Sequence, residues 1–278
     1  MSVAWVEPDW RAPGGVRALS TLRSGGVSLA PYASLNLGGH VGDLPEAVAE
    51  NRRRLVVEAE LPSEPVWLAQ VHGITVADLD ATLGAGESAA AGVGVAAAYT
   101  ADAAFAAAAA VTAPAAITAD AAFTRRPGRV CAILAADCLP VLLTDDSGGV
   151  VAAAHAGWRG LAGGVLEATV RAMGERPERL MAWLGPAIGP GHFEVGAEVR
   201  EALLKGDAGA EGAFTRNARG RFMADLGTLA RRRLAALGVH RIDGGGHCTH
   251  ADAERYFSHR RDGMTGRQAT LIWLGPAK

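Results

Sequence analysis

The sequence predicts an α/β or α+β fold with mixed β-sheets. Short apolar runs bounded by Gly, Pro and Asp alternate along the chain with segments whose apolar residues recur at helical spacing. A dense turn signal joins two of the strand-like runs, so hairpins occur among the helices. The chain has 278 residues and an apolar fraction of 49%, enough for a substantial core.

The N-terminal part of the chain predicts short strands, one helix and a further strand. The clearest early strand spans residues 18–22, and Asp43 is well placed to cap a helix from Pro45 to about Glu60. Residues 66–76 are expected to form a strand with His72 near its middle. A histidine in an apolar strand is more often a satisfied core residue than a ligand, although the adjacent Gly73 would let another group approach closely.

The centre of the chain predicts a hairpin. Two apolar runs, 130–135 and 141–144, lead into the turn signal Asp-Asp-Ser-Gly-Gly at 145–149, and a third apolar run follows at 150–154. We therefore expect the second and third runs to pair as antiparallel strands.

The pairing of this hairpin decides whether a thiol and an imidazole meet. With the loop centred near residue 147, Thr144 is expected to face Val150, which brings Cys138 within about one position of His155. A slip of one residue would point the two side chains to opposite faces. A bulge at Pro140 could restore the facing, since proline in a strand is tolerated there.

The C-terminal half predicts alternating helices and strands. Helical spacing follows the glycine-flanked turn at 156–160, and its N-terminus would direct free N–H groups toward the neighbourhood of His155, as at anion sites. The expected elements are helices at 161–173, 198–204 and 225–237, the last closed by Gly238, and strands at 180–186, 239–242 and 269–274.

Cys138 and His155 admit three interpretations. They could share a metal ion, with thiolate sulfur and imidazole nitrogen as ligands, or the imidazole could deprotonate the thiol to make a nucleophile. Alternatively, Cys138 is a small buried apolar residue and His155 a hydrogen-bonded strand end.

Several motifs in one order resemble a known family. The segments AADCLPVLL and AAAHAGWRGLAGGV are similar to core motifs of the laccase-domain (polyphenol oxidase-like) family, whose bacterial members are also called peptidoglycan editing factors. Further matching segments follow the family's order, at 34–37, 41–43, 51–52, 70–73, 183–196, 256–258 and 265–267. Together they cover nearly the whole chain apart from an Ala-rich insertion at about 84–117. The resemblance implies a single domain over residues 1–278, built from two packed mixed β-sheets flanked by helices.

The resemblance also implies a function and a site. Members are treated as zinc-dependent purine nucleoside phosphorylases with adenosine deaminase activity, so phosphate and adenosine, inosine or methylthioadenosine are the expected small-molecule partners. His72 becomes the third metal ligand beside Cys138 and His155, and three protein ligands with a vacant fourth position are typical of catalytic zinc. The expected substrate-binding residues are Asn36, Arg52, Arg159 and Arg260, because phosphate needs positive charge and N–H donors near the metal.

Two other functions stay open. One is a metal-free Cys–His hydrolase or amidase that edits peptidoglycan precursors, with Cys138 as nucleophile and His155 as base. The other is a copper-dependent phenol oxidoreductase, for which His192, His247, Cys248 and His250 are possible additional ligands, or else a protein whose site only binds a ligand. The chain departs from the family pattern at Gly191, where many members carry a cysteine, and at His259, where a tyrosine is common.

Composition limits the class of partner and the compartment. The formal net charge is −2 and the basic residues are scattered, which predicts no nucleic-acid binding. The longest weakly apolar window, 96–116, contains Asp102 and Pro114, so no membrane span is expected. The N-terminus does not resemble a signal peptide, and three cysteines cannot all pair, so we expect a cytoplasmic protein. We expect the protein to be a monomer or a small homo-oligomer.

Overall fold

The structure, a computed structural model, describes residues 2–82 and 117–276. Its largest sheet has six strands, in the spatial order β12 (Arg241–Gly244), β8 (Leu180–Leu184), β6 (Leu139–Asp145), β7 (Val151–Ala156), β4 (Ala121–Thr124) and β3 (Val76–Asp78). The two outermost pairs are parallel and the inner pairs antiparallel, so the sheet is mixed.

Two antiparallel sheets complete the β structure. The first has the order β1 (Trp5–Val6), β2 (Val16–Thr21), β13 (Gln268–Leu274) and β5 (Val130–Ala135). The second is a small sheet of β10 (Phe214–Arg216), β11 (Phe222–Ala224) and β9 (Glu194–Val195).

Helices connect and cover these strands. The α-helices of the described residues are α1 (Pro45–Glu58), α2 (Leu79–Thr82), α3 (Trp158–Gly163), α4 (Val165–Met173), α5 (Ala197–Leu204), α6 (Leu226–Ala236) and α7 (His259–Asp262). Short 3₁₀ turns lie at Pro177–Arg179 and Ala208–Ala213. Every helix in this part of the chain is too short or too polar to span a bilayer.

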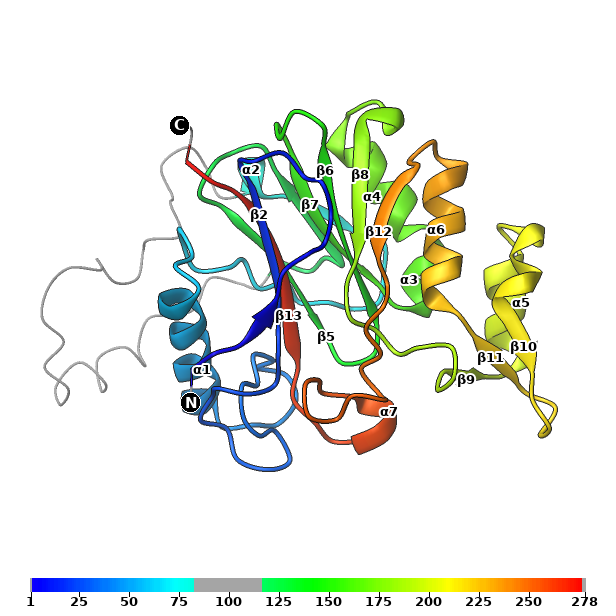
Figure 1. Ribbon diagram of the computed structural model, residues 1–278, viewed down its shortest axis with the longest axis horizontal. Coiled ribbons are helices and arrows are strands. Elements are labelled where there is room, and N and C mark those ends of the chain that lie inside the picture. Colours follow the sequence, from blue (N-terminus) through cyan, green and yellow to red (C-terminus); the bar gives the residue numbers. More distant parts are fainter. Residues whose placement is uncertain (1, 83–116, 277–278) are drawn as a thin grey trace, which may run out of the picture.

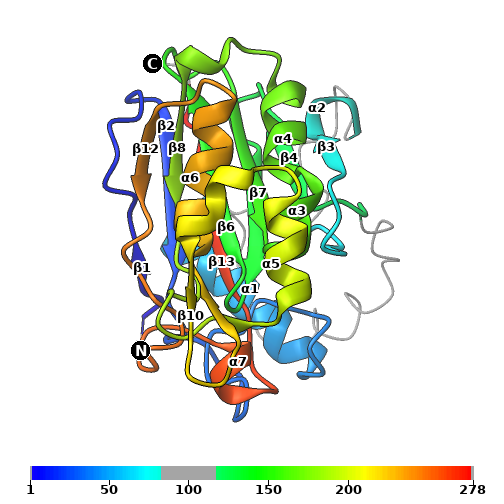
Figure 2. The same cartoon turned by 90° about the vertical axis from the view of Figure 1, so that its right-hand side faces the viewer.

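The sheets and helices stack in four layers: α1, the four-stranded sheet, the six-stranded sheet, and α4 with α6 (Figure 1). Successive side chains of a strand point to opposite faces of the sheet, so the two buried faces are lined by different residues. Val141 and Leu143 of β6 pack with α4 and α6, whereas Leu142 between them packs with Ile133 and Ile272 of the four-stranded sheet. Viewed from the helical side, α3 to α6 lie over the larger sheet (Figure 2).

The predicted fold class is confirmed, with one addition. Two sheets pack face to face between helices, as the resemblance implied, and the small sheet of β9–β11 is a third that the sequence did not predict. The strands predicted at 18–22, 180–186 and 269–274 correspond to β2, β8 and β13. Residues 84–116 of the predicted Ala-rich insertion lie outside the described residues.

Two predicted helix features are wrong. Asp43 does not cap α1, because its carboxylate instead accepts hydrogen bonds from the hydroxyl of Ser28 and the amide of Asn36, at 2.6 and 2.8 Å. The single helix expected at 161–173 is two helices, because Gly164 adopts a left-handed backbone with φ of 99° and ends α3 before α4 begins.

The strand expected at residues 66–76 does not form as predicted. Only isolated bridges occur before β3, at Val66 with Cys131 and at Ala69 with Thr118. His72 has a φ of 61°, a left-handed conformation that no strand contains. The segment is therefore a loop, which begins beside Cys131 of β5 and places His72 next to Asp120, just before β4.

Candidate metal centre

The β6–β7 hairpin is present, but its register differs from the prediction by one residue. Thr144 pairs with Val151 and not with Val150, and the ladder continues without a bulge through Pro140, which pairs with His155. The turn is wider than expected because Asp145 organises it, as its carboxylate accepts N–H bonds from residues 147, 149 and 150.

The observed register places Cys138 and His155 on the same side of the hairpin. The ladder ends at Leu139, and continuing it by one residue sets Cys138 opposite Gly157. Because side chains two residues apart along a strand share a face, Cys138 faces the same side as His155 on a diagonal. The two side chains therefore converge within about one position of each other, as expected, and without the bulge considered at Pro140.

Gly157 provides the space that the Cys138 side chain occupies. A Cβ at position 157 would lie 2.7 Å from the Cys138 sulfur and 3.3 Å from its Cβ. The backbone of Gly157, with φ −60° and ψ 162°, is one that any residue adopts. Glycine is therefore required here for room and not for conformation.

Gly157→Ala is accordingly expected to displace the thiol and weaken metal binding by about tenfold or more, while destabilising the fold by roughly 1–3 kcal/mol. Affinity is measured by competition with a chelating dye, and stability by denaturant unfolding. Gly191→Ala is the matched control, since a Cβ there would meet nothing within 4 Å. Unchanged affinity in Gly157→Ala would show that the thiol need not sit where the structure places it.

Asp120 holds the loop that carries His72. Its carboxylate accepts hydrogen bonds from three consecutive backbone N–H groups, those of Val71, His72 and Gly73, at 3.2, 2.8 and 2.6 Å. Asp120 is fully buried and lies just before β4. The left-handed backbone of His72 is thus stabilised by a tertiary contact, and the close approach expected at Gly73 is made by this carboxylate.

The same carboxylate orients His155. The Nδ1 atom of His155 lies 2.9 Å from Asp120 Oδ1, and the backbone N–H of His155 donates to the Asp120 carbonyl at 2.7 Å. An ionised carboxylate only accepts hydrogen bonds, so Nδ1 carries the proton and Nε2 is left as a ligand atom. This carboxylate–histidine pairing is the usual way in which a metal-binding imidazole is fixed.

The three predicted ligands are brought together. The donor atoms of His72, Cys138 and His155 lie within 4.8 Å of one another, and the Cys138 sulfur is 3.9 Å from His72 Nε2. Tetrahedral zinc with two nitrogen ligands and one sulfur ligand needs donors about 3.5 Å apart, so adjustments of about 1 Å would suffice. His155 is buried, Cys138 half-buried and His72 exposed, which leaves an open side for a reactant.

The electrostatics of the trio favour a thiolate. Burial alone would raise the pKa of Cys138, but hydrogen bonds with His155 and His72 outweigh burial and lower this pKa to about 6. Burial would lower the pKa of His155, yet its hydrogen bonds with Asp120 and Cys138 raise it to about 9. Burial opposes ionisation of Asp120 too, and the bonds from His155 and the 71–73 loop more than compensate, so its pKa is lowered.

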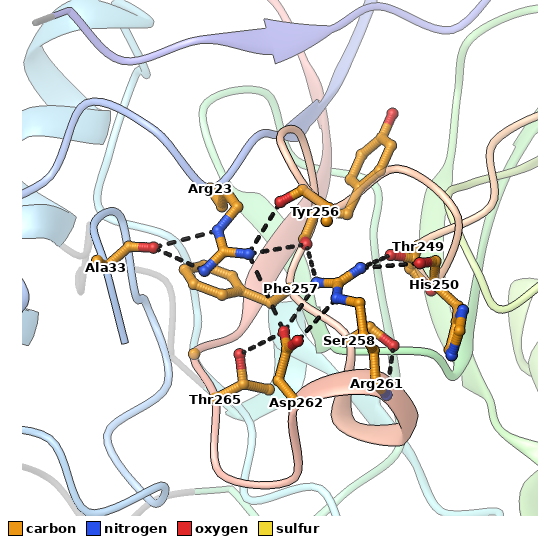
Figure 3. A network of polar contacts seen from close by, with 12 residues as sticks. Arg23, Ala33, Thr249, His250, Tyr256, Phe257, Ser258, Arg261, Asp262 and Thr265 are labelled. Carbon is orange, nitrogen blue, oxygen red and sulfur yellow. Dashed lines mark hydrogen bonds and ion pairs between the residues drawn. The ribbon is translucent and has the colours of Figure 1, made fainter. Parts of the chain in front are cut away.

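Asp137 anchors the backbone just before Cys138. It has a φ of 96°, and its carboxylate accepts from the Thr249 hydroxyl at 2.7 Å and from the Arg260 backbone N–H at 2.6 Å. Thr249 and Arg260 belong to the chain segment before β13, and Figure 3 shows the contacts that hold this segment. Arg23 and Arg261 both form ion pairs with Asp262, and Arg261 also donates to the Thr249 carbonyl. The position of Cys138 therefore depends on the loop before β13.

The four predicted substrate-binding residues are in different environments. Asn36 is fully buried, and its amide bonds to Gly38, Asp43 and the Arg267 N–H, so its visible role is to shape a loop. Arg260 donates to the Glu194 carbonyl at 2.8 Å. Arg159 is exposed and stacks on the Trp158 ring at 4.5 Å. Arg52, half-buried, lies with its guanidinium 4.3 Å from the Trp67 ring.

Sequence reasoning missed Asp120 as a member of the site, and it did not place His40 and Arg267 near the trio, where the charges of these residues act on one another. Asp120 belongs to a repeated Thr-Ala-Asp-Ala-Ala-Phe segment that has the composition of a surface insertion, although an acidic residue immediately before an apolar run was a usable signal. His40 and Arg267 lie on loops, with no periodicity to place them.

The additional histidines and cysteine do not form a second metal centre. Within the described ranges, His72, Cys138 and His155 are the one group of three or more His, Cys, Asp or Glu side chains arranged to hold a metal. The rings of His192 and His250 stack on each other at 4.2 Å, and the Cys248 sulfur accepts the Gly189 N–H at 3.2 Å.

The chain is similar to known proteins over nearly its whole length. The family model described as multi-copper polyphenol oxidoreductase laccase matches residues 17–275. The purine nucleoside phosphorylase YfiH of Shigella flexneri is 49% identical over 269 residues, covering 97% of this chain and 98% of the relative. A purine nucleoside phosphorylase of Pseudomonas aeruginosa is 50% identical over 272 residues, covering 98% of each.

Solved structures show the same fold. A Neisseria meningitidis protein superposes with a TM-score of 0.82 at 43% identity, covering 98% of this chain and 99% of that one. YlmD from Geobacillus stearothermophilus gives a TM-score of 0.80 at 32% identity, covering 95% and 93%.

Proposed function

The chain belongs to the multi-copper polyphenol oxidoreductase laccase family, and on that premise we propose that it is a zinc-dependent enzyme of purine nucleosides. The proposed reactions are phosphorolysis of adenosine, inosine or methylthioadenosine and hydrolytic deamination of adenosine. The names of the relatives at 49% and 50% identity support the substrate class. The observation that carries the proposal is the convergence of His72, Cys138 and His155 with one side open.

The chain's own residues would perform three tasks. His72, Cys138 and His155 would hold the ion, which when bound supplies a Lewis acid able to activate water or polarise a substrate oxygen near neutral pH. Asp120 keeps Nδ1 of His155 protonated and Nε2 directed at the site. Arginine side chains around the trio would hold phosphate against the sugar.

The proposed chemistry balances in both reactions. In phosphorolysis, a phosphate oxygen bonds to C1′ of the ribose while the C1′–N9 bond breaks. The bonding electron pair leaves with the purine, which takes up a proton, and sugar 1-phosphate is the other product. In deamination, water adds at C6 of adenine and ammonia leaves.

Two features support zinc and an intracellular site of action. The two-nitrogen, one-sulfur donor set is one that zinc accepts in catalytic sites. Cys131, Cys138 and Cys248 are all free thiols, and the ligand thiol is best preserved in the reducing cytoplasm.

The test is to incubate the purified protein with adenosine, with and without phosphate, and to resolve adenine, inosine and hypoxanthine by chromatography. Adenine that forms only with phosphate demonstrates phosphorolysis, and inosine in either buffer demonstrates deamination. The same assay on protein stripped by a chelator and reloaded with zinc or copper identifies the metal. Absence of all three products, or oxygen uptake with a phenol at a rate that follows copper content, would overturn the proposal.

A further inference from the structure

A basic cluster forms around the loop at residues 36–40. Arg52 of α1 donates through Nε and one terminal nitrogen to the Leu37 carbonyl, at 3.1 and 2.9 Å. The Leu37 N–H donates to the Arg267 carbonyl at 3.1 Å, and the Arg267 N–H to the Asn36 amide oxygen at 2.9 Å. These bonds tie the Arg52 guanidinium, the Arg267 backbone and the loop that ends in His40 together.

Glycine at position 38 lets the Arg267 side chain lie against this loop. A Cβ at that position would be 2.8 Å from Arg267 Cγ, closer than real Cβ contacts. The loop lies just before α1 in the sequence, whereas Arg267 is 231 positions from Asn36, so tertiary packing brings the second arginine to this loop.

Neither arginine of the cluster forms an ion pair among the described residues, although more distant negative charges act on both. Arg267 donates to the carbonyls of Thr265 and Gly266 at 3.0 Å each, and Arg52 bonds a carbonyl and stacks on Trp67. Burial lowers the pKa of both, and Glu64 acts on Arg52 only from beyond ion-pair distance.

Neighbouring arginines of α1 show the contrast. Arg53 and Arg54 both pair with Glu50, at 2.7 and 2.8 Å. A partly desolvated guanidinium without a carboxylate is costly unless something else supplies the negative charge. For Arg52 and Arg267 the described protein supplies that charge only from beyond ion-pair distance, through Glu64 for Arg52 and through Cys138 and Asp137 for Arg267.

The cluster adjoins the metal centre. His40 lies close enough to Arg52, Arg267, His72 and His155 for their charges to act on it. Arg267 is in turn close enough to Cys138 and Asp137 to interact with their negative charges. His40 is exposed and both arginines are half-buried, so a small solute can reach all three.

We propose that His40, Arg52 and Arg267 form an oxyanion subsite that holds inorganic phosphate beside the metal centre. This inference rests on the proposed phosphorolysis, which supplies phosphate as a co-substrate. Two guanidinium groups present N–H donors in a planar geometry that matches phosphate oxygens, and a phosphate dianion would supply the close anionic partner that neither arginine has among the described residues. The subsite differs from the one expected from sequence, in which Arg159 and Arg260 accompany Arg52.

The experiment compares Arg267→Gln, Arg267→Lys and His40→Gln with the unaltered enzyme. Phosphate binding is measured calorimetrically at constant ionic strength, and the KM for phosphate is measured at saturating nucleoside. Loss of a charged hydrogen-bonding group is expected to weaken phosphate binding and raise its KM about 10- to 100-fold. The KM for nucleoside and the metal content should stay within about twofold. Arg53→Gln is the matched control, because Arg53 lies next to Arg52 on α1 but pairs with Glu50.

The outcomes separate this inference from the proposed function. Phosphate binding that is lost in Arg267→Gln and His40→Gln supports the subsite even if no phosphorolysis is detected, in which case the proposed function alone fails. Phosphorolysis with an unchanged phosphate KM in these variants would overturn the subsite and leave the function standing. His40→Gln protects the test against misfolding, since no hydrogen bond of the described residues depends on the His40 ring. Arg267→Lys should recover part of the affinity, because it keeps the charge but not the fork.

Discussion

Cys138→Ala is expected to leave the purified protein without bound metal and without measurable nucleoside turnover. Removal of a hydrogen-bonding partner of a metal ligand already costs about 10- to 100-fold in affinity, so loss of a ligand atom should cost more than about 100-fold. His72→Ala should behave in the same way, because its Nε2, 3.9 Å from the Cys138 sulfur, is another donor atom of the same group. Metal content is measured by mass spectrometry on protein purified without chelators.

Cys248→Ser provides the control for this experiment. Cys248 is half-buried like Cys138, but its sulfur accepts backbone N–H bonds from Gly189 and Ala251, a role that a hydroxyl can fill. The Cys248→Ser variant should retain the metal content and the activity of the unaltered protein. A Cys138→Ala protein that keeps its metal, or a metal-free enzyme inactivated by alkylation of Cys138, would refute the metal centre and favour the nucleophilic Cys–His alternative.

Asp120→Ala is expected to lower metal affinity about 10- to 100-fold and to destabilise the fold by about 3 kcal/mol or more. The substitution leaves three N–H groups of residues 71–73 and Nδ1 of His155 without their acceptor, and each unpaired buried donor costs about 1–3 kcal/mol. Free to rotate, His155 would lose its preferred tautomer, and His72 would lose the support for its left-handed backbone. Affinity is measured by chelator competition and stability by denaturant unfolding.

Asp145→Ala is the control that separates loss of metal affinity from loss of fold stability. Asp145 is also buried and also accepts three backbone N–H bonds, but it does so in the turn of the β6–β7 hairpin, at the other end of both strands. This variant should lose stability while its metal affinity stays within about twofold. Equal losses of affinity in both variants would mean that Asp120 acts through general stability and not by orienting the ligands.

The hairpin illustrates what apolar patterning determines. The strands of β6 and β7 were predictable because apolar runs flank a strong turn signal, and the meeting of Cys138 with His155 followed from their pairing. The register was wrong because the Asp145 carboxylate widens the turn, an effect of one side chain that turn propensities do not include.

The loop of His72 illustrates what such patterning omits. Residues 66–76 have the composition of a strand, yet a carboxylate 48 positions away from His72 satisfies its N–H and bends the chain. Tertiary hydrogen bonds of this kind override local propensity, and nothing in the segment itself reports them. For the same reason the sequence does not place His40 and Arg267 together. In the structure, the loop at 36–40 is hydrogen-bonded both to Arg52 of α1 and to Arg267.

The metal centre gathers residues from segments that meet only after the larger sheet has closed. His72 precedes Cys138 by 66 positions, and its loop is held by Asp120 from the edge of β4. A nascent chain therefore has no preformed chelating motif, and a metal ion would bind late in folding, after the segments that carry the three donor atoms have packed together.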